Sequence, residues 1–578
     1  MLRRLLRRFI KLAIFTAIIF LIVAISRAVA HHYHPNSVLV LELDGPLKER
    51  AGGTGFDFWR EHGNGLNTIR RALGSAKDDP RIVGLAIKMY DPTIELAQAQ
   101  ELDDLIAQFR ARGKWVTAYM ETAGEGGFGN LPYMVASAAD EVSMMPQGEL
   151  NLLGVNMREL FARGLFDWIK VKPVFDAIGK YKDAANIFTQ KDYTPAQREE
   201  DEALAGDIFT QVVNETASHR HLTPDAIRAI IDRAPLTAAD GLKAKLLDRL
   251  EYEDEFVARV KSYRGSEHPL IDADSYVGPH PWFSRAHDKI AVIYGIGAIT
   301  RGESNYDPVM SPGSESMGSD DMVSAFKDAQ DDNAVRAVVF RINSPGGSVI
   351  ASELIRHAVQ ECAHAKPVVV SMGDYAASGG FWIATPAAKL YADPGTVTGS
   401  IGVLGGKFDI SGAAAALGIN SGAVTSGANA GMFDSFTDFT PPQAELFRNQ
   451  IGETYRYFVA LVAQQRKMTT AQVDAIAQGR VWTGAQALQI KLVDGLGGFD
   501  TALTEAKRLA KLDPQAPVRI EELPAQAGPL TRLINGRLYS EASWRPPRAL
   551  QPLLQAARQA LAREGAFGQV YCPVHPAL

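Results

Sequence analysis

Cysteine is scarce in this chain, and its scarcity excludes two kinds of structure. Only Cys362 and Cys572 occur among 578 residues, far apart in the sequence. Two distant cysteines supply neither a metal cluster nor a disulfide framework. Cys362 falls in an apolar helical pattern, so we expect it to be a small core residue. Nothing in the sequence indicates a metal or another cofactor.

An excess of charge of one sign is also absent. Sixty Lys and Arg stand against 66 Asp and Glu, and the formal net charge of −6 gives no electrostatic reason to expect a nucleic-acid partner. With 46% hydrophobic and 22% charged residues, the composition is that of a globular protein. A chain of this length exceeds one hydrophobic core, so we expect several domains.

Long apolar runs are absent but for one, at residues 12–25. The basic residues before it are Arg3, Arg4, Arg7, Arg8 and Lys11. Basic residues before an apolar run and few after it predict that the N-terminal end stays in the cytoplasm and the body is exported. We interpret residues 1–35 as a basic tip followed by a single transmembrane anchor. The alternative is a cleaved signal peptide, because residues 28–30 resemble a cleavage site, although Arg27 interrupts the usual approach to such a site.

An internal repeat is the most informative feature that the sequence does contain. Three pairs of segments recur at nearly constant separation: 38–43 with 290–295, 78–88 with 331–341, and 236–248 with 482–494. Both halves alternate short apolar strands with amphipathic helices, for which 96–112 and 352–365 are examples. This alternation predicts an α/β fold with a largely parallel sheet in each half.

The repeat also predicts the domain boundaries. The first repeat should span residues 36–275 and the second 285–513, with a joint in the polar, Pro-containing stretch 266–287. The tail, residues 514–578, is irregular until a helical pattern near 550–563, and the sequence assigns it no role.

Ser378 is the best candidate for a nucleophile. A short apolar strand at 367–371 is followed by a Gly-rich turn and then by a helical pattern from Phe381. A serine at such a strand-to-helix turn exposes its Oγ beside backbone N–H groups, and Gly379 lets a substrate backbone approach closely. The alternative is a tight turn without a catalytic role. In the repeat alignment Ser378 falls on Asn130, which cannot act as a serine-type nucleophile.

The first repeat supplies two candidate bases, Lys180 and Lys182. Their counterparts in the second repeat are Ser426 and Ala428. One half thus offers a hydroxyl without a base and the other a base without a hydroxyl, which predicts one site shared between the halves. A lysine activates serine only when it is neutral, and burial favours that form. Both lysines would share a face of an extended segment, so spacing does not choose between them.

Other residues could complete or replace this pair. Gly346 and Gly347 end a strand, and their N–H groups could form an oxyanion hole with that of Gly379. Their counterparts at 89–93 include no glycine. His357 and His364, on the preceding helix, are rival bases. Residues 402–408 lack the spacing of a phosphate-binding loop and are interpreted as a flexible loop.

Five motifs together resemble one known family. They are residues 343–348, 371–382, 398–403, 481–484 and 493–497. In this combination they resemble the signal peptide peptidase A (protease IV) family of S49 serine peptidases, in its long, two-repeat form.

The resemblance covers nearly the whole chain. It implies tandem ClpP/crotonase-like domains and a Ser/Lys dyad of Ser378 as nucleophile and Lys182, rather than Lys180, as base. It further implies a membrane-anchored homotetramer without cofactor that degrades cleaved signal peptides and other apolar peptides. In a Gram-negative cell the body would lie on the periplasmic side of the inner membrane.

Two other functions remain as alternatives. A crotonase-type acyl-CoA enzyme also builds an oxyanion hole from backbone N–H groups but needs no nucleophilic serine. A non-catalytic, membrane-tethered scaffold would use both halves for assembly only.

Overall fold

The computed structural model describes residues 33–50, 65–276, 288–304, 315–513, 518–524 and 569–571. The expected membrane anchor and the helical pattern near 550–563 lie outside these residues. Among the helices that are described, none is both long and apolar enough to cross a membrane.

Six parallel strands with the same order form the centre of the sheet in each half, and the eight-stranded sheet of the second half also contains β17 (Val397–Gly399) and the antiparallel β19 (Val481–Thr483). The first sheet has the order β8-β4-β3-β2-β1-β9, and the second contains the equivalent order β20-β16-β15-β13-β10-β21. The first-half strands are β1 (Ser37–Pro46), β2 (Ile82–Thr93), β3 (Trp115–Met120), β4 (Glu141–Met144), β8 (Arg249–Leu250) and β9 (Leu270–Asp272). The second-half strands are β10 (Lys289–Ile296), β13 (Val335–Ser344), β15 (Val368–Ala377), β16 (Lys389–Ala392), β20 (Gly495–Leu496) and β21 (Arg519–Leu523). The predicted tandem α/β plan is therefore confirmed.

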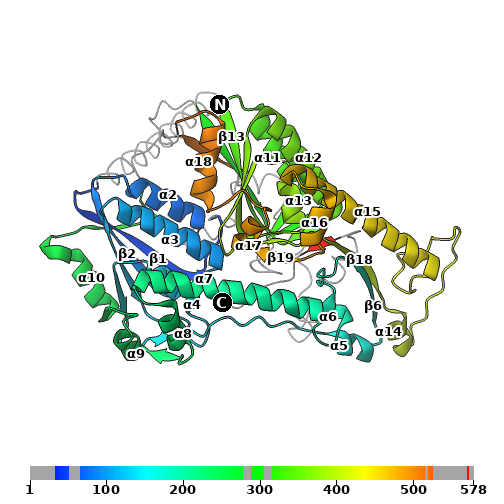
Figure 1. Cartoon of the computed structure of the whole chain (residues 1–578), viewed down its shortest axis with the longest axis horizontal. Helices are drawn as coiled ribbons and strands as arrows, with labels where there is room; N and C mark the ends of the chain where they lie inside the picture. Colours follow the sequence, from blue (N-terminus) through cyan, green and yellow to red (C-terminus); the bar gives the residue numbers. More distant parts are fainter. Residues whose placement is uncertain are drawn as a thin grey trace, which may run out of the picture.

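The helices repeat in the same way. The matching pairs are α3 (Leu96–Ala111) with α12 (Val349–Ala365), α4 (Asn130–Ser137) with α13 (Gly379–Ala384), and α7 (Pro195–Arg220) with α15 (Pro441–Arg466). The two long helices have 26 residues each, begin with proline after a threonine N-cap, and end at a left-handed residue, His221 or Lys467. Figure 1 shows α7 extending from the first repeat along the lower side of the second, where it contacts β19 (Val481–Thr483).

The remaining helices surround these elements. They are α2 (Leu66–Ala76), α5 (Arg163–Trp168), α6 (Asn186–Thr189), α8 (Pro224–Ile231), α9 (Ala238–Lys243), α10 (Glu253–Lys261), α11 (Ser319–Asp331), α14 (Ser411–Ala416), α16 (Thr470–Ile476), α17 (Gly484–Gln489) and α18 (Phe499–Leu509). Cys362 is fully buried on α12, as expected of a core residue.

A third sheet combines strands from both halves. Its order is β12-β11-β14-β22-β18-β6. The strands are β12 (Ser316–Gly318), β11 (Ala298–Thr300), β14 (Gly346–Ser348), β22 (Gln569–Tyr571), β18 (Val403–Asp409) and β6 (Lys172–Ile178). β6 of the first half pairs with β18 of the second along its whole length. The interpretation of residues 402–408 as a flexible loop is therefore wrong, because the ladder with β6 holds most of this segment as a strand.

The two halves also share a buried network of charges. Arg341 on β13 is fully buried, and its guanidinium donates to Glu49 at 2.7 and 3.0 Å and to Glu101 on α3. Arg70 on α2 donates to the same two carboxylates. Burial alone would lower the pKa of Arg341, but the carboxylates of Glu101 and Glu49 outweigh it and raise the pKa well above its usual value. The carboxylates that form ion pairs with this second-half residue thus come from the first half.

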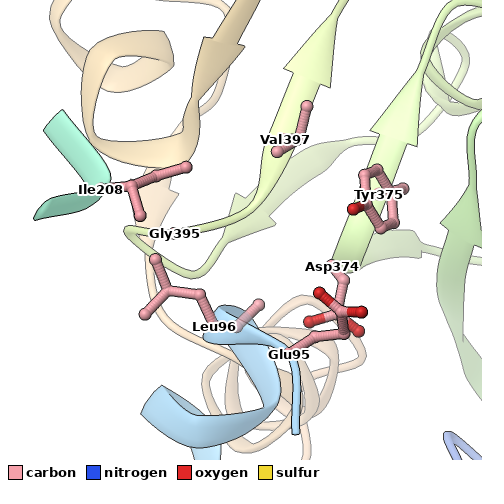
Figure 2. A pocket seen from close by; sticks show the side chains of 8 residues that line it. Glu95, Leu96, Ile208, Asp374, Tyr375, Gly395 and Val397 are labelled. Atoms are coloured by element: carbon pink, nitrogen blue, oxygen red, sulfur yellow. The ribbon is translucent and has the colours of Figure 1, made fainter. Parts of the chain in front are cut away.

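A small pocket lies in the same joint and holds two acids. In Figure 2, Glu95 at the start of α3 and Asp374 on β15 point into the space that Tyr375 and Val397 line from the second half. Burial, together with the neighbouring Glu95, raises the pKa of Asp374 well above its usual value, and burial also raises the pKa of Glu95. The backbone N–H of Gln98 and the side-chain amide of Asn343 donate hydrogen bonds to the Asp374 carboxyl group. The pocket therefore belongs to the joint between the repeats.

Replacing Arg341 should show how much the joint depends on this network. Arg341→Met leaves Glu49 and Glu101 without their ion-pair partner from the second half, and breaking a buried ion network in this way costs about 3–5 kcal/mol. The free energy of unfolding in urea should fall by about that amount. Arg336→Met on the same strand is the control, since the Arg336 side chain is half exposed. Equal stability of the two variants would contradict a role for the network.

Candidate active site

Ser378 lies where β15 ends and α13 begins, as the sequence predicts. Its φ of 59° is in the left-handed region, which is strained for a residue with a Cβ. Its N–H donates to the Gly399 carbonyl at 2.8 Å, and its carbonyl accepts from Trp382. These bonds fix the strained turn, so that the side chain of Ser378 leaves the backbone in a set direction. The side chain is fully buried.

Lys182 reaches Ser378 from the other half of the chain. The amine Nζ donates to Ser378 Oγ at 2.7 Å, and it also lies 2.9 Å from Ser400 Oγ and 3.1 Å from the Ser400 carbonyl oxygen. Lys182 is only 5% exposed, and Ser378 and Ser400 are 0% and 1% exposed. Burial penalises an ammonium ion, and an amine can act as a base only in its neutral form.

Ser400 was not among the predicted site residues. It lies on the turn between β17 (Val397–Gly399) and β18, with a φ of 49°, and its N–H donates to the Arg480 carbonyl at 2.7 Å. The sequence signal was present, because Ser400 belongs to the motif 398–403 that carries the family resemblance. Its hydroxyl orients the Lys182 amine toward Ser378.

The structure separates the two candidate lysines. Residues 179–182 form a turn after β6 and not an extended segment, so the expectation that both lysines share a face is wrong. Lys180 is exposed, and its amine bonds Glu199 and the hydroxyl of Tyr181. Only Lys182 turns inward to the serine.

Gln478 holds the lysine turn against the second repeat. Its carbonyl accepts from the Tyr181 N–H at 2.7 Å, and its side-chain oxygen lies 3.3 Å from the Lys180 N–H. Its side-chain amide donates to Asp474 at 2.7 Å. The φ of Gln478 is 55°, which is unfavourable for a residue with a Cβ, and these contacts hold the backbone in that conformation. Nothing in the sequence pattern distinguishes this glutamine, because its role depends on a contact between segments about 300 residues apart.

Gly479 makes the close approach to Lys182 possible. A Cβ at this position would lie 2.5 Å from the Lys182 backbone nitrogen, and the φ of 82° also favours glycine. Its N–H donates to the Ile401 carbonyl. The turn that carries Lys182 and the turn that carries Ser400 therefore both pack against the backbone of Gly479.

Two acids lie directly behind the lysine. Burial raises the pKa of Asp183 to about 6, and burial and the neighbouring Asp183 raise the pKa of Glu200 on α7 well above its usual value. The Glu200 carboxyl accepts the N–H of Val481 and is hydrogen-bonded to Asp183, so it joins the lysine turn to β19.

The predicted oxyanion-hole glycines lie together, but not all are equivalent. A Cβ on Gly379 would lie 3.1 Å from the Gly347 nitrogen, so the backbones of these two residues are adjacent at the start of α13. The Gly346 N–H instead donates to Ser344 Oγ at 3.2 Å. The geometry therefore favours Gly347 and Gly379 over Gly346 as donors. In the first half, β2 runs unbroken through the equivalent position, and Asn130 bonds Gly154.

The histidine alternatives lie elsewhere. His357 and His364 are exposed on the outer side of α12, and His364 lies beside Glu361. Within the described ranges, no group of three or more His, Cys, Asp or Glu side chains is arranged to hold a metal ion.

Comparison with known proteins assigns the family. The model of peptidase family S49 matches residues 108–266 and 360–513, one segment in each repeat. The chain belongs to peptidase family S49. It is therefore a serine peptidase, and the two matched segments are tandem S49 domains.

Similarity to individual relatives extends over most of the chain. The chain is 35% identical to Protease 4 of Salmonella typhi over 484 residues, which cover 81% of this chain and 75% of that protein. Identity to Protease 4 of Haemophilus influenzae is 30%, over 82% of this chain and 78% of the relative. The chloroplastic Serine protease SPPA of Arabidopsis thaliana is 26% identical, over 86% of this chain and 73% of the relative.

Gln478→Ala should misplace the lysine without removing it. We expect kcat for peptide hydrolysis to fall about tenfold or more, because small displacements of a catalytic group have large costs, while KM changes little. Gln478→Asn keeps an amide that can both accept and donate, and asparagine tolerates the left-handed φ, so this variant should retain more activity. Steady-state kinetics of both variants test this. A change in KM alone would argue against positioning of the lysine.

Proposed function

We propose that the chain is a Ser/Lys endopeptidase in which Ser378 is the nucleophile and Lys182 the general base. The observation that carries this proposal is the 2.7 Å hydrogen bond between Lys182 Nζ and Ser378 Oγ inside a buried site. The finer fold assignment, tandem ClpP/crotonase-like domains, is part of the same proposal and is supported by the repeated parallel sheets.

The proposed reaction has two steps. Lys182 takes the hydroxyl proton as Ser378 Oγ attacks the peptide carbonyl carbon, and the oxyanion accepts hydrogen bonds from Gly347 and Gly379. The C–N bond breaks, the amine leaves with the proton from Lys182, and an acyl-enzyme ester remains. Water, deprotonated by Lys182, then hydrolyses the ester and regenerates Ser378. Ser400 keeps the amine oriented throughout.

Cleaved signal peptides are the proposed substrates, together with other apolar peptides. The family membership and the similarity to Protease 4 support this class of substrate, and a shorter relative from Enterococcus faecium carries the name Putative signal peptide peptidase SppA. A crotonase-type acyl-CoA enzyme would have no need for the buried lysine beside the serine. The expected homotetramer stays a prediction.

Matched variants test the dyad. Ser378→Ala and Lys182→Arg should each lower kcat by several orders of magnitude, because the first lacks the nucleophile and guanidinium stays protonated. Lys180→Arg is the control and should keep most of the activity, since Lys180 is exposed. In the wild type, activity should rise with pH as the amine loses its proton, below about 10.4. Peptide hydrolysis against pH measures both effects. An active Lys182→Arg variant would show that the base lies elsewhere.

We also propose that the body is anchored in the inner membrane by residues 1–35 and lies on the periplasmic side. The basic residues before the apolar run support this orientation. Protease added to spheroplasts should digest the body, whereas a cytoplasmic control protein stays intact. Protection of the body until the membrane is permeabilised would contradict the topology. A fraction released by alkaline carbonate would instead favour cleavage after residues 28–30.

A further inference from the structure

The ladder between β13 and β15 is interrupted directly before the candidate active site. Ile342 pairs with Met372. The next pair is Ser344 with Ala376, so that two steps along β13 match four steps along β15. β15 therefore bulges between these pairs. Bulges bend a strand and re-aim the side chains that follow, and they are frequent beside active sites.

The bulge changes the partner of β15. Before it, residues 369–372 pair with β16, and after it, residues 375–377 pair with β17. The last residue of β17 accepts the backbone N–H of Ser378, and the Ser400 turn follows at once. The bulge is thus the point at which the strand that carries the nucleophile turns toward the lysine site.

The side chain of Asn343 closes the bulge. Its Oδ1 accepts the backbone N–H of Tyr375 at 3.0 Å, and its Nδ2 donates to Asp374 Oδ2 at 3.1 Å. Figure 2 shows Asp374 and Tyr375 at this bend of β15. A Cβ on Gly373 would lie 3.2 Å from the Asn343 Cβ, so the bulge packs closely on the asparagine. One side-chain amide thus takes the place of backbone pairing across the bulge.

The first repeat also holds the bulge. Asp374 Oδ1 accepts the backbone N–H of Gln98 at 3.2 Å, in the first turn of α3. The unpaired N–H groups of a helix N-terminus are suited to such an acceptor. The Asp374 carboxyl is therefore fixed between Asn343 of its own repeat and a helix of the other repeat.

Both segments that leave the bulge carry groups of the candidate active site. Gly347 follows shortly after Asn343, and Ser378 follows shortly after Tyr375. A Cβ on Gly379 would lie 3.1 Å from the Gly347 nitrogen, so the two segments meet again at the oxyanion donors. A side chain that joins the segments at the bulge therefore controls how the donors and the nucleophile lie relative to each other.

The corresponding ladder of the first repeat is regular. Six consecutive residues of β2 pair with six of β3 without a shift. In the repeat alignment Asn343 falls on Tyr90, whose hydroxyl bonds Glu253. The bulge and its asparagine thus accompany the repeat that carries Ser378.

We propose that Asn343 is a positioning residue whose side-chain amide closes the β15 bulge and so sets the distance between Ser378 and the oxyanion donors. The proposal rests on the proposed function, because it takes Ser378 as the nucleophile. The role requires an acceptor for the Tyr375 N–H and a donor to Asp374 on one side chain. Loss of either bond lets the bulge relax, and a displacement of about 1 Å at the reacting groups can cost about 100-fold in rate.

Two substitutions test this role. Asn343→Leu removes both hydrogen bonds at a similar side-chain volume and should lower kcat for peptide hydrolysis about tenfold or more, with little change in KM. Asp374→Asn places an NH2 group against either Asn343 Nδ2 or the Gln98 N–H, so it should lower kcat in the same way. Asn333→Leu, at an exposed asparagine before β13, is the control and should keep the parental kcat.

Rescue separates positioning from a general structural role. The double variant Asn343→Asp/Asp374→Asn exchanges donor and acceptor, so the two side chains can pair again, and its kcat should return to within about threefold of the parent. A peptide aldehyde gives a second readout, because the oxygen of its hemiacetal with Ser378 lies in the oxyanion hole. Its inhibition constant should rise in both single variants and fall again in the double variant.

The outcomes distinguish the two proposals. An unchanged kcat in folded Asn343→Leu overturns the positioning role, as does a rise in KM at constant kcat. If Asn343→Leu does not fold, a double variant no more active than Asp374→Asn has the same meaning. Full activity of Ser378→Ala would instead contradict the proposed function, and the positioning role with it.

Discussion

The hydrogen bond between Lys182 and Ser378 joins side chains from different repeats, and the site exists only while the two repeats keep one relative position. A shift of 1 Å would separate an amine and a hydroxyl that now lie 2.7 Å apart. The β6–β18 ladder fixes the lysine turn on one side, and the contacts of Gln478 and Gly479 fix it on the other. The shared sheet is therefore as much a part of the catalytic geometry as the two side chains.

Buried charged side chains also hold the two repeats in one relative position. Apolar packing alone would allow the repeats to slide, because dispersion contacts have little directional preference. The Arg341 guanidinium accepts only a narrow range of carboxylate positions, so Glu49 and Glu101 fix orientation as well as proximity. The core also crosses the joint: Tyr375, Ala377 and Val397 of the second repeat pack into the cluster of the first.

The sequence could predict the features that depend on the repeated segments and on the alternation of apolar strands with amphipathic helices. The tandem α/β plan followed from the duplication and from the alternation of strands and helices, and the choice of Ser378 followed from the strand–turn–helix pattern around it. The choice of Lys182 over Lys180 required the turn after β6, and the contributions of Ser400, Gln478 and Glu200 required contacts across the joint. Residues 402–408 were misread because their glycines suggested a loop, while a strand far away in the sequence provides the pairing that orders them.

The two repeats show what each copy of a duplicated domain lacks when one site is shared between them. Asn130 now bonds Gly154, β2 continues where the second repeat breaks its strand to present two glycines, and the second repeat has lost the lysines in turn. Each repeat keeps the fold but carries only one of the two side chains, so a single repeat expressed by itself would contain half of the dyad.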